Sequence, residues 1–256
     1  MMRLSAGWLD SVDSQAVCAA LTGAGHRALF VGGCVRNALL GTPVQDLDIA
    51  TDATPDQTAR LAEAAGLRAV PTGAAHGTIT VVAGGRPYEV TTFRRDVETD
   101  GRHAQVAFST RVEDDAARRD FTMNALYAAP DGRVIDPLGG IADLQAGHLR
   151  FIGDPAQRIA EDYLRILRFF RFTAWYGAPD LGVDADGLAA CAAGLPGLAR
   201  VSAERVGHEL RRLLSAPDPA PAVAAMSASG VLASVLPGAL SDALPVLVAQ
   251  EAELEA

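Results

Sequence analysis

Apolar and polar positions in the first half of the chain form short β-like runs that alternate with helical stretches, and glycine or proline bounds most of them. This alternation is typical of a sheet that carries helices on its faces. One helix is expected from Arg36 and another from Pro55, where Thr54 and Gln57 form an N-terminal capping signature. The expected strands are 28–31, 46–51, 78–83, 88–93, 124–128 and 133–136.

Two breaks in this pattern predict connections between the regular elements. Gly84 and Gly85 separate two β-rich runs, so we expect a hairpin there. The segment 94–108 is polar, charged and glycine-containing, and we expect it to form a long mobile loop.

The second half of the chain shows a helical pattern only. Asp154 and Pro155 form a helix-start signature, and the apolar spacing predicts one helix over 154–176. A second helix is expected at 202–214, and alanine-rich helical sequence follows it. We therefore expect an α/β unit followed by an all-helical part, with the boundary near residue 148.

The composition narrows the class of protein. An apolar share of 49% in 256 residues supports a folded core, and the length favours two units. Three widely spaced cysteines fit neither a disulfide framework nor a zinc site, and no secretory signal or membrane span is recognisable, so a cytoplasmic protein is expected. The net charge of −9 argues against a protein that coats nucleic acid, so any RNA contact should be local and no DNA partner is expected.

A pair of aspartates is the first candidate for chemistry. Asp46 and Asp48 lie two positions apart in an expected strand, so their side chains should project from the same face. Carboxylate oxygens are ligands that Mg²⁺ prefers, and two such ions can stabilise the attacking and leaving oxygens of a phosphoryl displacement. Glu89 interrupts an apolar, threonine-rich run and is the candidate third carboxylate. The alternative is an ordinary strand with a solvated acidic face.

A glycine pair precedes these acids. Gly32 and Gly33 end the first expected strand, and Arg36 follows in the next helix. Backbone N–H groups at such a turn can approach a triphosphate, although glycines at these turns are more often purely conformational. Further along, Arg118 and Arg119 precede Asp120, and two adjacent arginines can serve one phosphate or ribose only if the chain turns there; the alternative is a surface ion pair.

A repeated spacing marks the helix expected at 154–176. Its charged residues Asp162, Arg165, Arg168 and Arg171 recur every third position. Residues three apart are neighbours on one helix face, while leucine and phenylalanine cover the remainder. An amphipathic helix with solvated arginines is the alternative, but three arginines and an acid in so apolar a helix favour a functional face.

Eight motifs, in order over about residues 28–214, closely resemble the class II tRNA nucleotidyltransferases, which are the CCA-adding enzymes, and their poly(A) polymerase relatives. The motifs are VGGCVRNALLG, DLDIAT, EVTTFRRD, DGRH, RRDFTMNAL, DPLGGIADL, GDPAQRIAEDYLRILRFFRF and SAERVGHEL. The resemblance implies a polymerase-β-like α/β nucleotidyltransferase head, with a mixed sheet and flanking helices, followed by an all-α neck and a body. We expect the head at 1–147, the neck at 148–215 and the start of a partial body at 216–256.

The resemblance also implies roles for the candidate residues. Asp46 and Asp48 would bind Mg²⁺ with Glu89 in support, and nucleotides from CTP and ATP would be joined to the 3′ end of tRNA with release of pyrophosphate. The residues expected to contact the nucleotide are Gly32, Gly33, Arg36, Arg119, Asp120, Asp162, Arg165, Arg168 and Arg171.

Asp162 and Arg165 are implied to act as a protein template for the base. A carboxylate only accepts hydrogen bonds and a guanidinium only donates them, whereas cytosine and adenine both present an exocyclic amine beside an unprotonated ring nitrogen. Such a pair accepts CTP and ATP and rejects UTP and GTP. A poly(A) polymerase, an enzyme that adds only CC or only the final A, and a non-catalytic RNA-binding module are the alternatives. The segment Asp100-Gly101-Arg102-His103 favours CCA addition.

Overall fold

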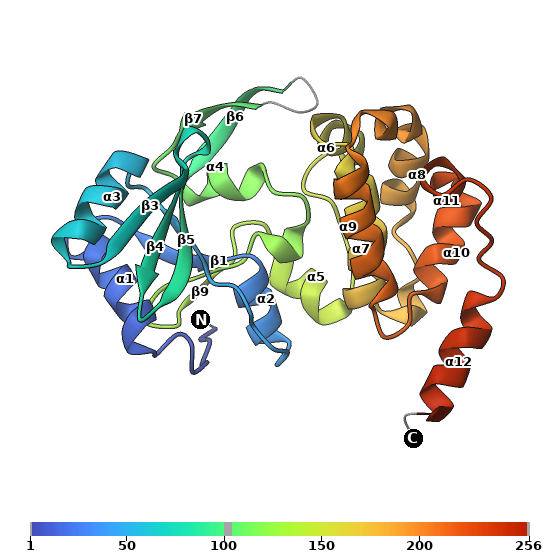
Figure 1. Cartoon of the computed structure of the whole chain (residues 1–256), viewed down its shortest axis with the longest axis horizontal. Helices are drawn as coiled ribbons and strands as arrows, with labels where there is room; N and C mark the ends of the chain where they lie inside the picture. The colour runs from blue at the N-terminus through green and yellow to red at the C-terminus, as the bar shows by residue number, and fades with distance from the viewer. Residues whose placement is uncertain (1, 100–103, 255–256) are drawn as a thin grey trace. The chain divides into compact units, whose positions relative to one another are not determined.

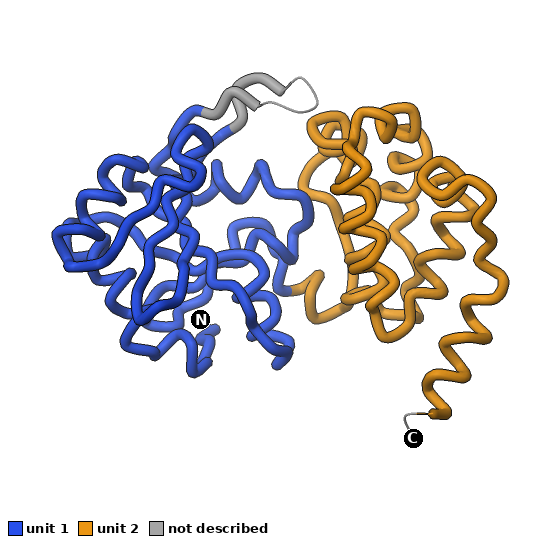
Figure 2. Tube along the Cα trace, in the orientation of Figure 1, with its two compact units in different colours: residues 1–98, 104–141 blue, residues 99–103, 142–256 orange. Residues whose placement is uncertain are grey.

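The computed structural model of the protein describes residues 2–99 and 104–254, so the motif Asp100-Gly101-Arg102-His103 lies outside the described residues. The chain divides into two compact units, which Figure 2 draws in different colours. The first unit comprises Met1–Glu98 and Ala104–Ile141, and the second consists mainly of the chain from Ala142 onward. This division falls a few residues before the predicted boundary near residue 148.

The described residues of the first unit form a mixed sheet of seven strands (Figure 1). The strands are β1 Ala28–Val31, β2 Asp48–Thr51, β3 Arg68–Gly73, β4 Thr78–Ala83, β5 Arg86–Thr92, β8 Tyr127–Ala128 and β9 Val134–Ile135. Their order across the sheet is β3-β4-β5-β2-β1-β8-β9. Neighbours in this described sheet are antiparallel, apart from β2 and β5, which run parallel. The strand that carries Asp48 therefore lies at the centre.

Two further strands form a separate ribbon. β6 Arg94–Thr99 and β7 Ala104–Phe108 pair with each other in a two-stranded sheet. The long mobile loop predicted for 94–108 is therefore wrong for these strands. The prediction relied on polar composition, but a ribbon can carry polar side chains on both faces, so polarity alone does not separate it from a loop.

Helices α1 Val12–Thr22 and α3 Pro55–Ala64 lie against each other and against β4. The predicted capping signature of α3 is confirmed, because Thr54 Oγ1 accepts from the N–H of Gln57 at 3.4 Å and the Gln57 side chain accepts from the N–H of Thr54 at 2.8 Å. The other described helices of the first unit are α2 Gly33–Leu39, α4 Val112–Ala117 and the 3₁₀ turns Ala74–His76 and Thr122–Asn124. Helix α5 Gly140–Ala146 begins in the first unit, and most of its residues belong to the second.

The core of the first unit is aromatic and aliphatic. All positions of β1 are buried, while β4 alternates between buried and partly exposed positions, as expected of a strand with one face in the core. Trp8 packs edge-on against Phe30 with ring centroids 4.9 Å apart. Among the largest buried side chains here are Phe30, Ile49, Tyr88, Phe93, Phe121 and Tyr127.

The second unit is helical. Its helices are α6 Pro155–Glu161, α7 Leu164–Tyr176, α8 Ala185–Ala193, α9 Ala203–Leu214, α10 Ala220–Ala228, α11 Val231–Val235 and α12 Leu244–Leu254, with 3₁₀ turns at Pro179–Leu181 and Leu195–Arg200. The α7 helix packs against α9 and α10, and Phe169 stacks on Phe151 with centroids 5.5 Å apart. A mixed sheet with flanking helices followed by helices alone confirms the predicted fold class. Within the described ranges, no helix is both long and apolar enough to cross a membrane.

A break replaces the single helix predicted for 154–176. The α6 helix ends at Glu161, Asp162 is extended with φ −154° and ψ 105°, and α7 begins at Leu164. Close packing accompanies this break, since a Cβ atom at Gly197 would lie only 1.9 Å from the ring of Tyr163. The apolar spacing continues through the break, which explains why the pattern alone predicts one helix. Asp162 therefore does not belong to the helical face that carries the arginines of α7.

Candidate active site

Two of the predicted acidic residues are aligned by the sheet. In the parallel pair of β2 and β5, Asp48 lies opposite Glu89, so their side chains share a face. The prediction that the strand begins at Asp46 is wrong, because β2 begins at Asp48 and Asp46 lies exposed two residues before it. Backbone pairing thus brings Asp48 and Glu89 together, and chain connectivity keeps Asp46 near them.

The charges at this end of β2 act on one another. Burial, followed by the negative charge of Glu89, raises the pKa of Asp48 to about 6; Arg119 opposes this rise and Asp46 adds to it. A cation bound here would offset the negative charges that raise the pKa of Asp48. Among the described residues, no three carboxylate, imidazole or thiol side chains surround a common point. Mg²⁺ commonly takes one or two carboxylates and completes its shell with water and phosphate oxygens, so this donor set fits it in chemistry.

The turn between β1 and α2 is shaped by Gly32. Its φ of 72° and ψ of −122° are rarely adopted by residues with a side chain, and its N–H donates to the carbonyl of Leu126 at 3.0 Å. Gly33 begins α2, and a Cβ atom there would lie 3.7 Å from Arg36 Nη2, an ordinary contact. The predicted order of strand, glycine turn and helix is present, and of the two glycines only Gly32 is required by its conformation.

Arg36 and Asp120 belong to one buried polar chain. Arg36 donates from Nε to Asn37 Oδ1 at 3.1 Å and from Nη1 to Asn124 Oδ1. Asn124 donates from Nδ2 to Asp120 Oδ1 at 2.9 Å, and the same oxygen accepts from the N–H of Phe121 at 2.8 Å. Arg36 and Asp120 are each 7% exposed. Sequence reasoning missed Asn124, which joins the two, because no spacing in the chain relates Arg36 to it.

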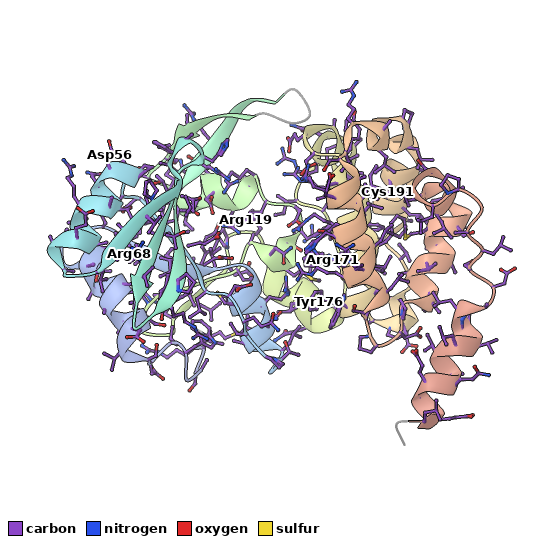
Figure 3. All side chains as sticks on the ribbon, in the orientation of Figure 1. Asp56, Arg68, Arg119, Arg171, Tyr176 and Cys191 are labelled. Carbon is purple, nitrogen blue, oxygen red and sulfur yellow. The ribbon has the colours of Figure 1, made fainter. Side chains whose placement is uncertain are left out.

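Arg119, which Figure 3 labels, has a buried acidic partner. Asp115 Oδ2 accepts from Arg119 Nη2 at 2.8 Å, and Asp115 Oδ1 accepts from Arg118 Nε at 2.9 Å. Burial alone would raise the pKa of Asp115, but the two arginines outweigh it and hold that pKa at about 2. Asp115 was missed in the sequence, although its position three and four residues before the arginines is the spacing of helical ion pairs.

Asp162 and Arg165 each have a partner of their own. Asp162 Oδ2 accepts from Arg205 Nη2 on α9 at 2.7 Å, and its other oxygen accepts from the N–H of the first residue of α7 at 3.1 Å. Arg165 Nη1 donates to Glu161 Oε2 at 2.6 Å and to the carbonyl of Arg158 at 2.7 Å. The two side chains proposed to select the base are thus held in place by neighbours within the second unit. Arg205 was missed because it lies far from Asp162 in the chain.

The two later arginines of α7 face α9. Arg171, labelled in Figure 3, is 4% exposed and donates from Nε to Glu209 Oε2 at 2.5 Å. Its guanidinium also lies 4.3 Å from the ring centroid of Phe172. Burial lowers the pKa of Arg171, and the charge of Glu209 opposes that effect. Arg168 is more exposed, with Nη1 3.9 Å from Glu209 Oε1. The structure therefore places Arg171 inside the packing between α7 and α9, and Arg168 at its edge.

Two family models match the chain. Residues 28–150 match the model described as the poly(A) polymerase head domain. Residues 181–242 match the model described as a probable RNA and SrmB-binding site of polymerase A. The first match contains the candidate acids and the glycine turn, and the second lies within the helical unit.

Several named proteins are also similar to this chain in sequence. The mitochondrial CCA tRNA nucleotidyltransferase 1 of Mus musculus is 44% identical over 191 residues, which are 74% of this chain and 44% of that protein. The CCA-adding enzyme of Streptococcus sanguinis is 40% identical over 256 residues, which are 99% of this chain and 60% of that protein. The chain thus spans 44% to 60% of the length of these two relatives.

Solved structures agree with the sequence matches. The CCA-adding enzyme of Bacillus stearothermophilus in complex with CTP has a TM-score of 0.80 at 36% identity, over 93% of this chain and 57% of that one. A tRNA nucleotidyltransferase complexed with a primer tRNA and an incoming ATP analogue has a TM-score of 0.74 at 25% identity, over 93% of this chain and 68% of that one. The chain therefore belongs to the family of class II CCA-adding tRNA nucleotidyltransferases and poly(A) polymerases.

Proposed function

We propose that this chain adds C and A nucleotides to the 3′ end of tRNA, using CTP and ATP and releasing pyrophosphate. The observation that carries the proposal is the parallel alignment of Asp48 with Glu89. Burial and the negative charges of Glu89 and Asp46 raise the pKa of Asp48, although Arg119 acts to lower it. Such a group of acids on a mixed sheet suits nucleotidyl transfer. The relatives are CCA-adding enzymes by name, and solved structures of similar proteins contain CTP, or a primer tRNA with an ATP analogue; both support the choice of substrates.

Asp46 and Asp48 are the proposed ligands of two Mg²⁺ ions, and Glu89 is the proposed supporting carboxylate. When bound, the metal ions would stabilise charge on the attacking 3′-hydroxyl and on the leaving pyrophosphate. Asp48 must be deprotonated to serve as a ligand, and a pKa of about 6 still leaves its carboxylate mostly ionised near neutral pH. Its partial burial also limits the water that competes for its carboxylate.

The turn at Gly32 and Gly33 is the proposed binding place of the triphosphate. Backbone N–H groups at the start of α2 can donate to phosphate oxygens, and Arg119 adds a positive charge close to Asp48. For Arg36 and Asp120 we propose an indirect part, since both are buried and Asn124 joins them. Their hydrogen bonds would fix α2 and the segment after α4 around the nucleotide.

Selection of the base is the proposed task of Asp162 and Arg165 in the second unit. Each would exchange a present partner, Arg205 or Glu161, for the edge of cytosine or adenine. Asp162 and Arg165 would themselves keep their hydrogen bonding in this exchange, because the carboxylate still accepts and the guanidinium still donates. For Arg168 we propose a supporting contact with phosphate, and for Arg171 the orientation of α7 against α9 through Glu209.

The test offers the purified chain three tRNAs, which end before, within or after CCA, with one labelled nucleotide at a time. Addition of two C and one A followed by arrest is the expected result. An Asp46→Ala variant should lose transfer, as should the wild type in excess EDTA, while the circular dichroism spectrum stays unchanged. Asp10→Ala, at an exposed aspartate of the same unit, is the matched control and should transfer normally.

A poly(A) polymerase is the second candidate, and the match to the poly(A) polymerase head domain favours it. The same assay separates the two, because long A tails on every acceptor would replace CCA addition by polyadenylation. Incorporation of C alone or of A alone would identify a partial enzyme. Retention of labelled tRNA without extension would reduce the chain to an RNA-binding module, and near-normal transfer by Asp46→Ala would refute the assignment of the metal ligands.

A further inference from the structure

The guanidinium of Arg119 uses one edge for contacts within the protein. Its Nη2 donates to Asp115 Oδ2 at 2.8 Å, and its Nε lies 3.1 Å from the same oxygen and 3.2 Å from the hydroxyl of Tyr127. Within the described part of the chain, the structure gives no hydrogen-bond partner to the third nitrogen, Nη1. That nitrogen would lie 3.4 Å from a Cβ atom at Gly32, so it borders the turn between β1 and α2.

Two buried residues hold this edge from different elements. Asp115 comes from α4 and is 1% exposed, and Tyr127 comes from β8 and is completely buried. The hydroxyl of Tyr127 donates to Asp115 Oδ2 at 2.8 Å, so the acid, the phenol and the guanidinium form a closed set of contacts. A side chain tied to both a helix and a strand has little rotational freedom left. Arg119 is therefore oriented before any ligand arrives.

The contacts also determine where the positive charge of Arg119 lies. Arg119 is among the groups that lower the pKa of Asp48, so its charge acts at the acidic end of β2. Asp115 keeps its negative charge at neutral pH, since its pKa is held at about 2. The ion pair therefore persists over the pH range in which a nucleotide would bind. Arg118 occupies the other oxygen of Asp115, which leaves Asp115 no freedom to turn away.

We propose that Asp115 and Tyr127 are positioning residues for the nucleotide, which hold the Nε and Nη2 edge of Arg119 so that Nη1 is presented to the triphosphate at the Gly32 turn. This inference rests on the proposed function, because it assigns a triphosphate to that turn. A fixed guanidinium binds a phosphate more tightly than a free one, since less side-chain entropy is lost on binding.

The main variant is Tyr127→Phe, which removes one hydroxyl and keeps the ring. Equilibrium dialysis of the full chain against labelled CTP or ATP, in the presence of Mg²⁺, gives the Kd of each nucleotide. The rate of nucleotide transfer to tRNA gives KM and kcat. We expect Kd and KM for both nucleotides to rise about threefold to tenfold, with kcat changed by less than about twofold and KM for tRNA unchanged. Asp115→Asn should have a larger effect, but it also leaves two guanidinium groups without their counter-charge.

Tyr88→Phe is the matched control. Tyr88 is another buried tyrosine of the same sheet, 1% exposed, whose hydroxyl lies 3.3 Å from Ser14 Oγ instead of near an arginine. Its substitution should leave the Kd of both nucleotides unchanged. A double-mutant cycle with Arg119→Lys then separates positioning from general stability, because lysine lacks the edge that Tyr127 holds. In the Arg119→Lys background, Tyr127→Phe should cause no further rise in Kd.

Each possible result has a clear meaning. An unchanged Kd in Tyr127→Phe, or a rise of equal size with arginine and with lysine at position 119, would overturn the inference while the wild type still binds and transfers nucleotides. A wild-type chain that binds neither CTP nor ATP would overturn the proposed function together with the inference. A rise in Kd confined to the Arg119 background supports the positioning role.

Discussion

Asp48, a proposed Mg²⁺ ligand, is predicted to reduce the stability of the first unit. Its pKa rises on folding from 3.8 to about 6, which is a difference of about 2 pH units. At about 1.4 kcal/mol per unit, the ceiling for the cost is about 3 kcal/mol, and solvent screening of this partly exposed group reduces it to roughly 1–2 kcal/mol. Asp48→Asn should therefore stabilise the first unit by that amount at neutral pH while it abolishes nucleotidyl transfer.

The sign of this effect depends on pH. Between pH 3.8 and about 6 the folded state binds more protons at Asp48 than the unfolded state does. The wild type therefore loses stability as the pH rises through this window, and above it the loss is complete. The advantage of Asp48→Asn should be full at about pH 8 and small at about pH 4. Mg²⁺ at about pH 8 should stabilise the wild type more than the variant and so narrow the difference.

Urea unfolding in EDTA, with and without excess Mg²⁺, measures these differences. The chain has two tryptophans, so a Trp175→Phe background leaves Trp8, which packs against Phe30, as the fluorescent reporter of the first unit. Asp10→Asn serves as the control at an exposed aspartate and should change the free energy of unfolding by at most about 0.5 kcal/mol. An Asp48→Asn variant that is no more stable than the wild type at about pH 8, or equally favoured at both pH values, would refute the reasoning.

Three further predictions concern the other parts of the site. Glu209→Ala should destabilise the second unit by about 3–5 kcal/mol in urea unfolding, because it leaves Arg171 buried without its partner, and a loss below about 1 kcal/mol would contradict the packing role. Asp162→Ala should relax the choice among the four nucleotides more than it slows transfer, so unchanged selectivity would refute the template assignment. Gly32→Ala should cost about 1–3 kcal/mol in thermal or urea unfolding because of its φ of 72°, and a neutral substitution would show that the turn adapts.

The order of elements in the first unit could be predicted from the sequence. Strand β1 coincides with the predicted 28–31 and β4 with the predicted 78–83, and the hairpin at Gly84 and Gly85 is confirmed by the antiparallel pairing of β4 with β5. These elements have strong local signals, namely apolar runs with glycine at their ends. The beginning of β2 had no such signal, and backbone pairing with β5 determines it.

The predictions failed where tertiary contacts override the local pattern. The helix predicted for 154–176 is broken at Asp162, and the packing of Tyr163 on Gly197 that accompanies this break joins residues far apart in the chain. Similarly, residues 94–99 and 104–108 form strands because these two pieces of backbone pair, which composition does not encode. Periodicity indicates the apolar face of a segment, and it carries no information about the tertiary contacts that the segment makes after folding.

Some residues of the candidate site could be identified from the sequence, and others only from their contacts in the structure. The sequence singled out Arg119, but Tyr127, which helps to hold it, is a buried aromatic residue like many others until the structure shows its hydroxyl beside the guanidinium. Asn124 could not be identified from the sequence either. Its role is visible only in the structure, where its amide oxygen accepts from Arg36 and its amide nitrogen donates to Asp120. The roles of all these residues stay predictions until the variants are measured.

The central place of β2 in the sheet has a consequence for how the site is preserved. Ile49 and Ala50, which follow Asp48, are buried and paired with strands on both sides, so their amide hydrogens exchange with solvent only when the sheet opens as a whole. The acidic end of the strand is thus attached to the most cooperative part of the unit. The alignment of Asp48 with Glu89 should therefore be lost only when the unit unfolds.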